Sequence, residues 1–376
     1  MAFKTSFKTV RDIPHLDGVR VLLRLDLNVP IQNGRVVDDF RIRQSLPTIQ
    51  YLQKAGAKVL IIGHIESKEK VSLKVVADYM QKFVTVRFVE NYRNVLKDFE
   101  TLPSGECLML ENLRTWEGEK VNDLKFAKEL ASLADVYVNE AFSVSHRAHA
   151  SIVGVPKCIP GYAGLLFEEE VKNLSQAFVP ERPFLFVLAG AKLETKIPLV
   201  EKFLKRADFV FVGGALANNF FKEQGYEIGA SLFSKLDFKL AEMMQNKKLY
   251  LPEAVVVKTV SGTKETKRPD QVLVGENILD VGERAVSVLA LLARKSQLVV
   301  WNGPLGDYEN GFSQGTEELA KVLAECGAKT IVGGGDTLAV IHKLGLEKSF
   351  SFISTAGGAM LDFLIHETLP GIEVLK

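Results

Sequence analysis

The chain has 376 residues, of which 47% are hydrophobic and 25% are charged, and its formal net charge is +1. This composition is typical of a globular protein with apolar material for two cores, so we expect two domains. The near-neutral charge balance argues against a general polyanion binder, and we expect no nucleic acid partner. The three cysteines lie far apart without CxxC spacing, which argues against a disulfide framework or a zinc site.

The first ten residues, MAFKTSFKTV, lack the apolar core of a signal peptide. No later segment is apolar over a length that would cross a bilayer. We therefore expect no membrane partner and a cytoplasmic location.

Short runs rich in Val, Ile and Leu alternate with longer helix-like segments. The strands expected in the first half are 19–29, 57–64, 84–89, 107–112 and 135–142. Those expected in the second half are 184–189, 209–213, 249–257, 298–301 and 330–333. Continuous apolarity is typical of strands buried on both faces. The sequence therefore predicts an α/β fold with two Rossmann-like domains, each a parallel sheet flanked by helices.

The junction between these domains is expected near a stretch rich in proline and glycine. Segment 165–178 follows this stretch and has the pattern of an amphipathic helix that ends before Pro180. We predict an N-terminal domain at 1–163, an interdomain helix with a hinge at 164–180, and a C-terminal domain at 181–363. The tail at about 364–376 is expected to pack back on the first domain. A single large sheet is the alternative, and it suits this length less well.

Polar residues follow the predicted strands of the first half, where ligands of open α/β sheets bind. Arg24, Asp26 and Asn28 share one face at period two, which is typical of ligands or of the solvated face of an edge strand. Cations follow at the ends of successive elements, and these are Arg41, His64, Arg114 and Arg147. Each alone is more often structural or solvated. Several cations on one rim suit a phosphate, so the set predicts an anion site.

The second half carries glycine-bearing turns after its strands. One contains Gly190 with Lys192 and Lys196, and another contains Gly334 with Asp336. Such turns allow phosphate to approach the backbone and a helix N-terminus, although solvated lysines and a capping Asp336 are the plainer interpretation. No GxxxxGK[ST], no GxGxxG with a suitable acid and no HRD…DFG set occurs, which excludes three common nucleotide-binding classes.

With these motifs in this order along the chain, the sequence resembles the phosphoglycerate kinase family over essentially its whole length. The segments that carry the resemblance are RLDLNVP (24–30), DDFRIRQSLPTIQYL (38–52), LENLR (110–114), NEAFSVSHRAHAS (139–151), GAKLETKI (190–197), LVVWNGPLG (298–306), VGGGDT (332–337) and STAGGA (354–359). The resemblance implies a hinge-closing monomer. It also implies reversible phosphoryl transfer from 1,3-bisphosphoglycerate to Mg-ADP, which gives 3-phosphoglycerate and Mg-ATP.

The resemblance also assigns site residues. Phosphoglycerate would be bound by Asp26, Asn28, Arg41, His64, Arg114 and Arg147. ATP or ADP would be bound by Lys196, Gly213, Asn302, Glu309, Gly334, Gly335, Asp336 and Thr337, with Mg²⁺ at Asp336. The catalytic residues would be Arg41, Lys192 and Lys196.

The loop after the second strand departs from the family, which usually has His-Leu-Gly-Arg-Pro there. Here the loop begins His64-Ile65-Glu66-Ser67-Lys68, so an expected arginine is replaced by Ser67. Lys68 is a candidate to compensate, whereas Glu66 adds a negative charge. Two alternatives to an active phosphoglycerate kinase therefore stay open: a homologue with a weakened phosphoglycerate site, and a non-catalytic nucleotide-binding scaffold.

Two family glycines of the nucleotide side are Ala215 and Ala356 here. The added methyl groups are harmless at negative φ and strained at positive φ. Segment 258–282 diverges from the family, which leaves the adenine contacts open.

Overall fold

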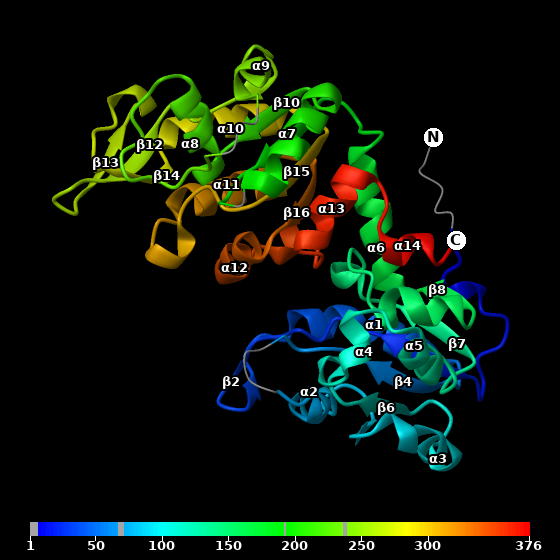
Figure 1. Cartoon of the computed structure of the whole chain (residues 1–376). Coiled ribbons are helices and arrows are strands. Elements are labelled where there is room, and N and C mark those ends of the chain that lie inside the picture. The colour runs from blue at the N-terminus through cyan, green and yellow to red at the C-terminus, as the bar shows by residue number, and fades with distance from the viewer. Residues whose placement is uncertain (1–6, 67–70, 192, 236–238) are drawn as a thin grey trace. The chain divides into compact units, whose positions relative to one another are not determined.

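The structure, a computed structural model, describes residues 7–66, 71–191, 193–235 and 239–376. Two compact units make up the chain (Figure 1). Unit 1 comprises Met1–Lys172 and Thr368–Lys376, and unit 2 comprises Asn173–Glu367. The division falls within helix α6 (Leu165–Leu174).

Unit 1 is built on a parallel sheet in the order β5-β6-β4-β1-β7-β8. Its strands, with the separate hairpin β2–β3, are β1 (Arg20–Arg24), β2 (Ile31–Gln32), β3 (Arg35–Val36), β4 (Lys58–Ile62), β5 (Val86–Val89), β6 (Cys107–Leu110), β7 (Val136–Asn139) and β8 (Gly161–Ala163). The central strands are almost wholly buried, which explains their continuous apolar runs.

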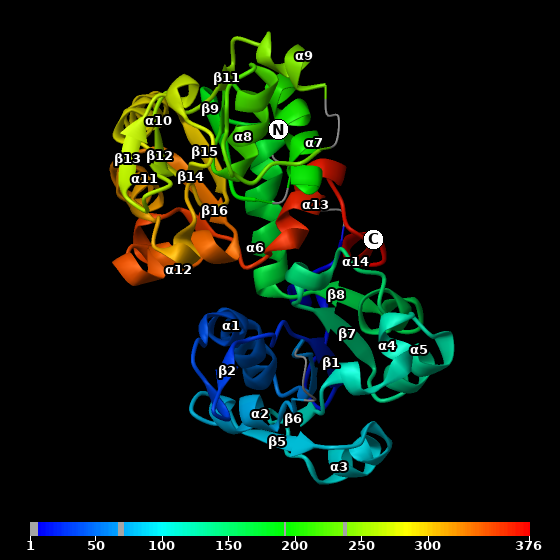
Figure 2. The same cartoon turned by 60° about the vertical axis from the view of Figure 1, so that its left-hand side comes forward.

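Helices cover both faces of this sheet, with α1 and α2 on one side and α4 and α5 on the other (Figure 2). The right-handed connection of parallel strands requires this, because the chain first steps outward from β1 and later returns past it. The helices are α1 (Phe40–Lys54), α2 (Lys74–Met80), α3 (Val95–Thr101), α4 (Glu117–Lys120), α5 (Leu124–Ala131) and α14 (Pro370–Glu373).

Unit 2 has a second parallel sheet in the order β11-β10-β9-β15-β16-β17. Its strands are β9 (Phe184–Leu188), β10 (Phe209–Val212), β11 (Leu249–Tyr250), β15 (Leu298–Asn302), β16 (Lys329–Gly333) and β17 (Phe352–Ile353). Large buried rings fill its core, and those of Phe186 and Phe203 stack with centroids 4.0 Å apart. The predicted fold of two parallel α/β sheets is confirmed.

Figure 2 shows α7, α8 and α13 on one face of this sheet and α10, α11 and α12 on the other. The helices of unit 2 are α7 (Leu193–Arg206), α8 (Ala215–Glu223), α9 (Leu240–Met244), α10 (Glu283–Lys295), α11 (Gln314–Glu325), α12 (Gly335–Leu344) and α13 (Gly358–His366).

The prediction of one strand at 249–257 is wrong. β11 ends at Tyr250 in the parallel sheet, and the chain then enters a separate antiparallel sheet of order β13-β12-β14. Pro252 lies between the two and has no N–H to donate to a ladder, so it separates two apolar runs. The small sheet consists of β12 (Val255–Lys258), β13 (Lys264–Lys267) and β14 (Asn277–Val281).

Within the described part of the chain, no helix combines the length and apolarity needed to cross a membrane.

The two alanines that replace family glycines have ordinary backbone conformations. Ala215 begins α8, and neither it nor Ala356 is among the non-glycine residues with positive φ. The methyl groups at these two positions therefore cause no backbone strain.

Candidate active site

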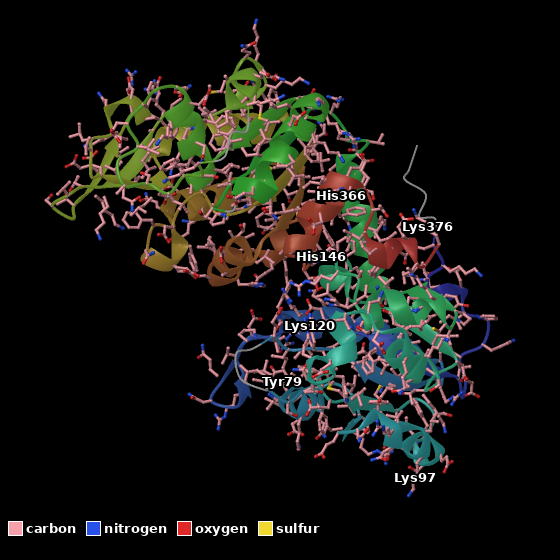
Figure 3. The ribbon with its side chains drawn as sticks, viewed as in Figure 1. Tyr79, Lys97, Lys120, His146, His366 and Lys376 are labelled. Atoms are coloured by element: carbon pink, nitrogen blue, oxygen red, sulfur yellow. The ribbon has the colours of Figure 1, made fainter. Side chains whose placement is uncertain are left out.

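Polar side chains gather beyond the carboxyl ends of the strands of unit 1. His64 follows β4, Arg114 lies in a short 3-10 helix after β6, and Arg147 follows β7. Figure 3 labels two residues of the same region, Lys120 at the end of α4 and His146 next to Arg147. Because the strands are parallel, these segments meet at one edge of the sheet.

His64 is a buried neutral imidazole. Only 1% of its surface is exposed, and its Nδ1 lies 3.1 Å from Nη2 of Arg24. Arginine nitrogens only donate, so Nδ1 accepts and the ring proton is on Nε2. Burial lowers the pKa of His64 far below its usual range, and the charges of Arg24, Arg114 and Arg147 lower it further. His64 therefore offers an Nε2–H donor that suits an anionic oxygen.

The guanidinium group of Arg114 lies at the same edge of the sheet. Its Nε, Nη1 and Nη2 atoms are all buried without a hydrogen-bond partner among the described residues. Burial lowers the pKa of Arg114, and the charges of Arg24 and Arg147 act in the same direction. Arginine nevertheless stays protonated in proteins, so this is a buried cation with its donors unused. An anion with several acceptor oxygens, such as a phosphate, would satisfy it.

Asp26 holds Arg41 at the same edge of the sheet. The Oδ2 atom of buried Asp26 lies 2.5 Å from Nη1 of Arg41, and Ser143 donates its hydroxyl to the same oxygen. The backbone N–H of Asn28 donates to Oδ1 of Asp26 at 3.1 Å. The carboxylate thus organises the loop after β1 and fixes a cation from α1 beside it.

Arg147 pairs with an acid from the divergent loop. Its Nη1 lies 3.4 Å from Oε2 of Glu66, and the Glu66 N–H donates to Oδ1 of Asn28 at 3.0 Å. Ser67 and Lys68 lie outside the described residues, so compensation by Lys68 stays a prediction.

Arg24 has a role that the sequence did not reveal. β1 is a central strand paired with β4 and β7, so the alternative of a solvated edge strand is wrong. Arg24 is fully buried, and its Nε donates to Oγ of Ser151 at 2.9 Å. The same hydroxyl donates to the buried carboxylate of Glu119 at 2.6 Å. This network fixes the Arg24 guanidinium, which in turn orients His64. The sequence feature that could have indicated this role is an arginine inside an otherwise apolar strand.

In unit 2, Lys196 of α7 lies where two strands end. Its side chain is almost fully buried, and Nζ donates to the carbonyl oxygen of Ala189. A Cβ at Gly190 would lie 2.9 Å from this Nζ, and one at Gly303 would lie 2.8 Å from it. Glycine at both turns therefore leaves room for the ammonium group. Lys192 lies outside the described residues.

A second turn brings Asn302, Gly334 and Thr337 together. Gly334 has φ +106, and a Cβ there would lie 3.5 Å from Oγ1 of Thr337 and 3.6 Å from Nδ2 of Asn302. The Thr337 hydroxyl is buried without a partner among the described residues. Helix α12 begins at Gly335, so its free N–H groups face the same turn. A helix N-terminus with an unpaired hydroxyl suits a phosphate.

A pocket of about 450 Å³ opens beside these turns within unit 2. Gly213 is not part of its lining, because it packs against Leu305, whose Cδ2 would lie 2.8 Å from an added Cβ. The lining combines apolar walls with glycine backbone and acids, including Gly190, Gly214, Phe221, Leu232, Glu309 and Asp336.

Asp280 also lines this pocket and was not predicted, since it lies in the divergent segment. Burial raises the pKa of its carboxyl to about 6, although the N–H of Gly315 donates to it at 3.1 Å. The described residues contain no group of three or more metal-ligating side chains. Mg²⁺ commonly uses one or two carboxylates plus ligand phosphates, and Asp336 in the pocket fits that pattern.

Parallel sheets with such groups beyond their strands are typical of α/β proteins that bind phosphorylated ligands. The sequence model of the family described as phosphoglycerate kinase matches residues 10–367. The phosphoglycerate kinase of Dictyoglomus turgidum is 39% identical over 98% of this chain and 99% of its own. That of Borrelia garinii is 36% identical over 99% of this chain and 100% of its own.

Solved structures agree with the sequence relatives. The structure of phosphoglycerate kinase from Coxiella burnetii is 37% identical, covers 98% of both chains and has a TM-score of 0.85. That from Pyrococcus horikoshii is 30% identical with the same coverage and TM-score. The chain belongs to the phosphoglycerate kinase family, which confirms the resemblance drawn from the sequence.

Proposed function

We propose that the chain catalyses reversible phosphoryl transfer from 1,3-bisphosphoglycerate to Mg-ADP, giving 3-phosphoglycerate and Mg-ATP. It is a phosphotransferase with a carboxyl group as acceptor in the reverse direction. Membership in the family supports this activity, and curated relatives with this name match nearly the whole chain. The observation that carries it is the guanidinium of Arg114, whose three buried nitrogens have no hydrogen-bond partner among the described residues.

The phosphoglycerate is bound in unit 1. Arg114 and Arg147 bind its phosphate through charge-assisted hydrogen bonds, and His64 donates Nε2–H to an oxygen of the ligand. Asp26 and Asn28 position the loop after β1 and contribute polar contacts. Arg41, held by Asp26, neutralises charge near the transferred group.

The nucleotide is bound in unit 2. Its base and ribose occupy the pocket lined by Phe221 and Leu232, and Glu309 contacts the ribose side. The phosphates lie beside Gly214, which lines the pocket next to Gly213, and along the turn of Gly334 and Gly335, where Asn302, Thr337 and the N-terminus of α12 donate. Asp336 holds Mg²⁺, which neutralises phosphate charge when bound.

The chemistry places few demands on the protein. The acceptor carboxylate is already anionic at neutral pH, so no general base is required. Catalysis consists of positioning and charge neutralisation, for which Arg41, Lys192 and Lys196 are the proposed groups. A monomer in the cytoplasm, closing about its hinge to exclude water, is the proposed setting.

The experiment is a reverse-direction assay. Purified protein receives 3-phosphoglycerate and Mg-ATP, and 1,3-bisphosphoglycerate is detected through reduction by a dehydrogenase that oxidises NADH. We expect saturable turnover in both substrates. Background turnover by a folded protein that still binds nucleotide would support the alternative of a non-catalytic scaffold.

A further inference from the structure

Glu66 brings a carboxylate into the cluster of cations at the sheet edge. Its Oε2 lies 3.4 Å from Nη1 of Arg147, with 51% of the Glu66 side chain and 39% of the Arg147 side chain exposed. Arg147 is one of the proposed phosphoglycerate ligands. The described residues therefore supply this arginine with an ion pair, whereas they supply the Arg114 nitrogens with no hydrogen-bond partner.

The Glu66 carboxylate is ionised at neutral pH. Burial opposes its ionisation, but Arg147, Arg114 and Lys120 outweigh burial and lower the pKa of the carboxyl. Glu66 in turn favours the charged form of Arg114. The negative charge of Glu66 thus interacts electrostatically with both arginines that are proposed to bind the phosphate.

The backbone keeps this carboxylate near the site. The N–H of Glu66 donates to Oδ1 of Asn28 at 3.0 Å, so the residue is tied to the loop after β1. A phosphate that approaches Arg147 must either displace the Glu66 carboxylate or lie beside a like charge. Both alternatives lower the affinity for a phosphorylated ligand.

We infer that Glu66 competes with the phosphorylated ligand for Arg147 and thereby weakens the binding of this ligand. The inference rests on the proposed function, because it takes 3-phosphoglycerate as the ligand. If the inference is right, the negative charge of Glu66 lowers the affinity of this chain for 3-phosphoglycerate.

The test uses Glu66→Gln, which keeps the side-chain length and the N–H bond to Asn28. We expect the dissociation constant for 3-phosphoglycerate, measured by calorimetry, to fall about threefold to tenfold, in line with a partly exposed charge pair. The KM should fall in parallel, while kcat stays within about twofold. Glu66→Asp retains the charge and should stay near the wild-type value.

Glu100→Gln, which removes an exposed carboxylate on α3, is the matched control and should change neither constant. A double-mutant cycle with Arg147→Gln tests the route of the effect. The gain from Glu66→Gln should be smaller in the Arg147→Gln background than in the wild type. Equal gains in both backgrounds would show that Glu66 does not act through Arg147 and would overturn the inference.

The two levels of failure are distinguishable. If the wild type turns over and Glu66→Gln leaves both constants unchanged, the inference alone is wrong. If the wild type binds 3-phosphoglycerate without turnover, the proposed activity fails while calorimetry still decides the role of Glu66. If it neither binds 3-phosphoglycerate nor turns over, both are overturned.

Discussion

Arg114 shows how a binding site departs from what stability alone would favour. A buried charge is costly unless it is paired, and a buried donor without an acceptor adds a desolvation penalty. Three nitrogens of one guanidinium meet neither requirement among the described residues. The free protein tolerates this cost at a position where an arriving phosphate would remove it.

Replacement of Arg114 by Gln should therefore separate binding from stability. We expect the dissociation constant for 3-phosphoglycerate to rise by about tenfold to a hundredfold, the loss of a charged hydrogen-bonding partner worth about 1.5–3 kcal/mol. The melting temperature of the free protein should stay level or rise, because an unpaired buried charge is removed. Calorimetry and thermal unfolding check the two quantities, and a clear drop in melting temperature would contradict this account of Arg114.

His149 adds a pH dependence at the same edge. Burial lowers its pKa to about 4, and the charges of Arg114 and Arg147 contribute. An unfolded histidine titrates near about 6.5, so between these values the unfolded chain binds a proton that the folded chain refuses. His149 therefore destabilises the fold progressively as the pH falls from about 6.5 to about 4.

His149→Gln removes this titration. We expect the free energy of unfolding of the variant to fall less steeply than that of the wild type between pH 7 and pH 4.5. Denaturant titrations at several pH values measure the two slopes, and identical slopes would show that the His149 environment is not as described.

At the scale of elements, helix α6 begins on a buried carboxylate. Glu140, which follows β7, accepts the N–H groups of Leu166 and Phe167, each at 3.1 Å, and the hydroxyl of Thr48. Gly164 is required beside it, since a Cβ there would lie 2.0 Å from Glu140 Oε2. The first N–H groups of a helix have no partner within the helix, so Glu140 serves as their cap.

Glu140→Gln replaces one of the two accepting oxygens by an amide NH2 group, which only donates. We expect the variant to lose about 1–3 kcal/mol of unfolding free energy, while Glu169→Gln on the exposed side of α6 changes it little. Burial raises the Glu140 pKa to about 7, so the wild type itself loses stability as the pH rises from about 4.5 to about 7. The deficit of Glu140→Gln, measured by denaturant titration, should accordingly be larger at pH 5 than at pH 8. A deficit that is absent at both would contradict the capping role.

The strands also show which parts of the fold can be predicted from the sequence. Long apolar runs such as those of β4 and β9 predict central strands well, because burial on both faces leaves a continuous pattern. The run at 249–257 misleads for the same reason, since composition does not reveal that the chain changes sheets at Pro252. The candidate site behaves similarly. The cations could be found as residues that follow strands, but the Arg24–His64 contact and the Glu66–Arg147 pair depend on long-range packing.

At the scale of the whole molecule, the proposed ligands of the phosphoglycerate lie in unit 1 and those of the nucleotide lie in unit 2. Each substrate should therefore bind and stabilise the protein without the other. Ligand at about 100 times its dissociation constant stabilises the folded state by about 2.7 kcal/mol. Thermal unfolding with each substrate alone should show a separate upward shift for each.

Removal of Mg²⁺ should act on one substrate only. With a chelator present, the shift produced by ADP should shrink, because Asp336 then faces phosphate without the intervening cation. The shift produced by 3-phosphoglycerate should be unchanged. Thermal unfolding with and without chelator makes the comparison, and an equal loss of both shifts would contradict the assignment of Asp336.

Family membership and the two candidate binding sites assign to this chain the transfer of a phosphoryl group between phosphoglycerate and a nucleotide. The most direct measurement supplies 1,3-bisphosphoglycerate and ADP to the purified protein and follows ATP formation. We predict saturable ATP formation that requires Mg²⁺ and weakens in Arg114→Gln mainly through KM. A folded protein that binds both substrates and forms no ATP above background would contradict the account.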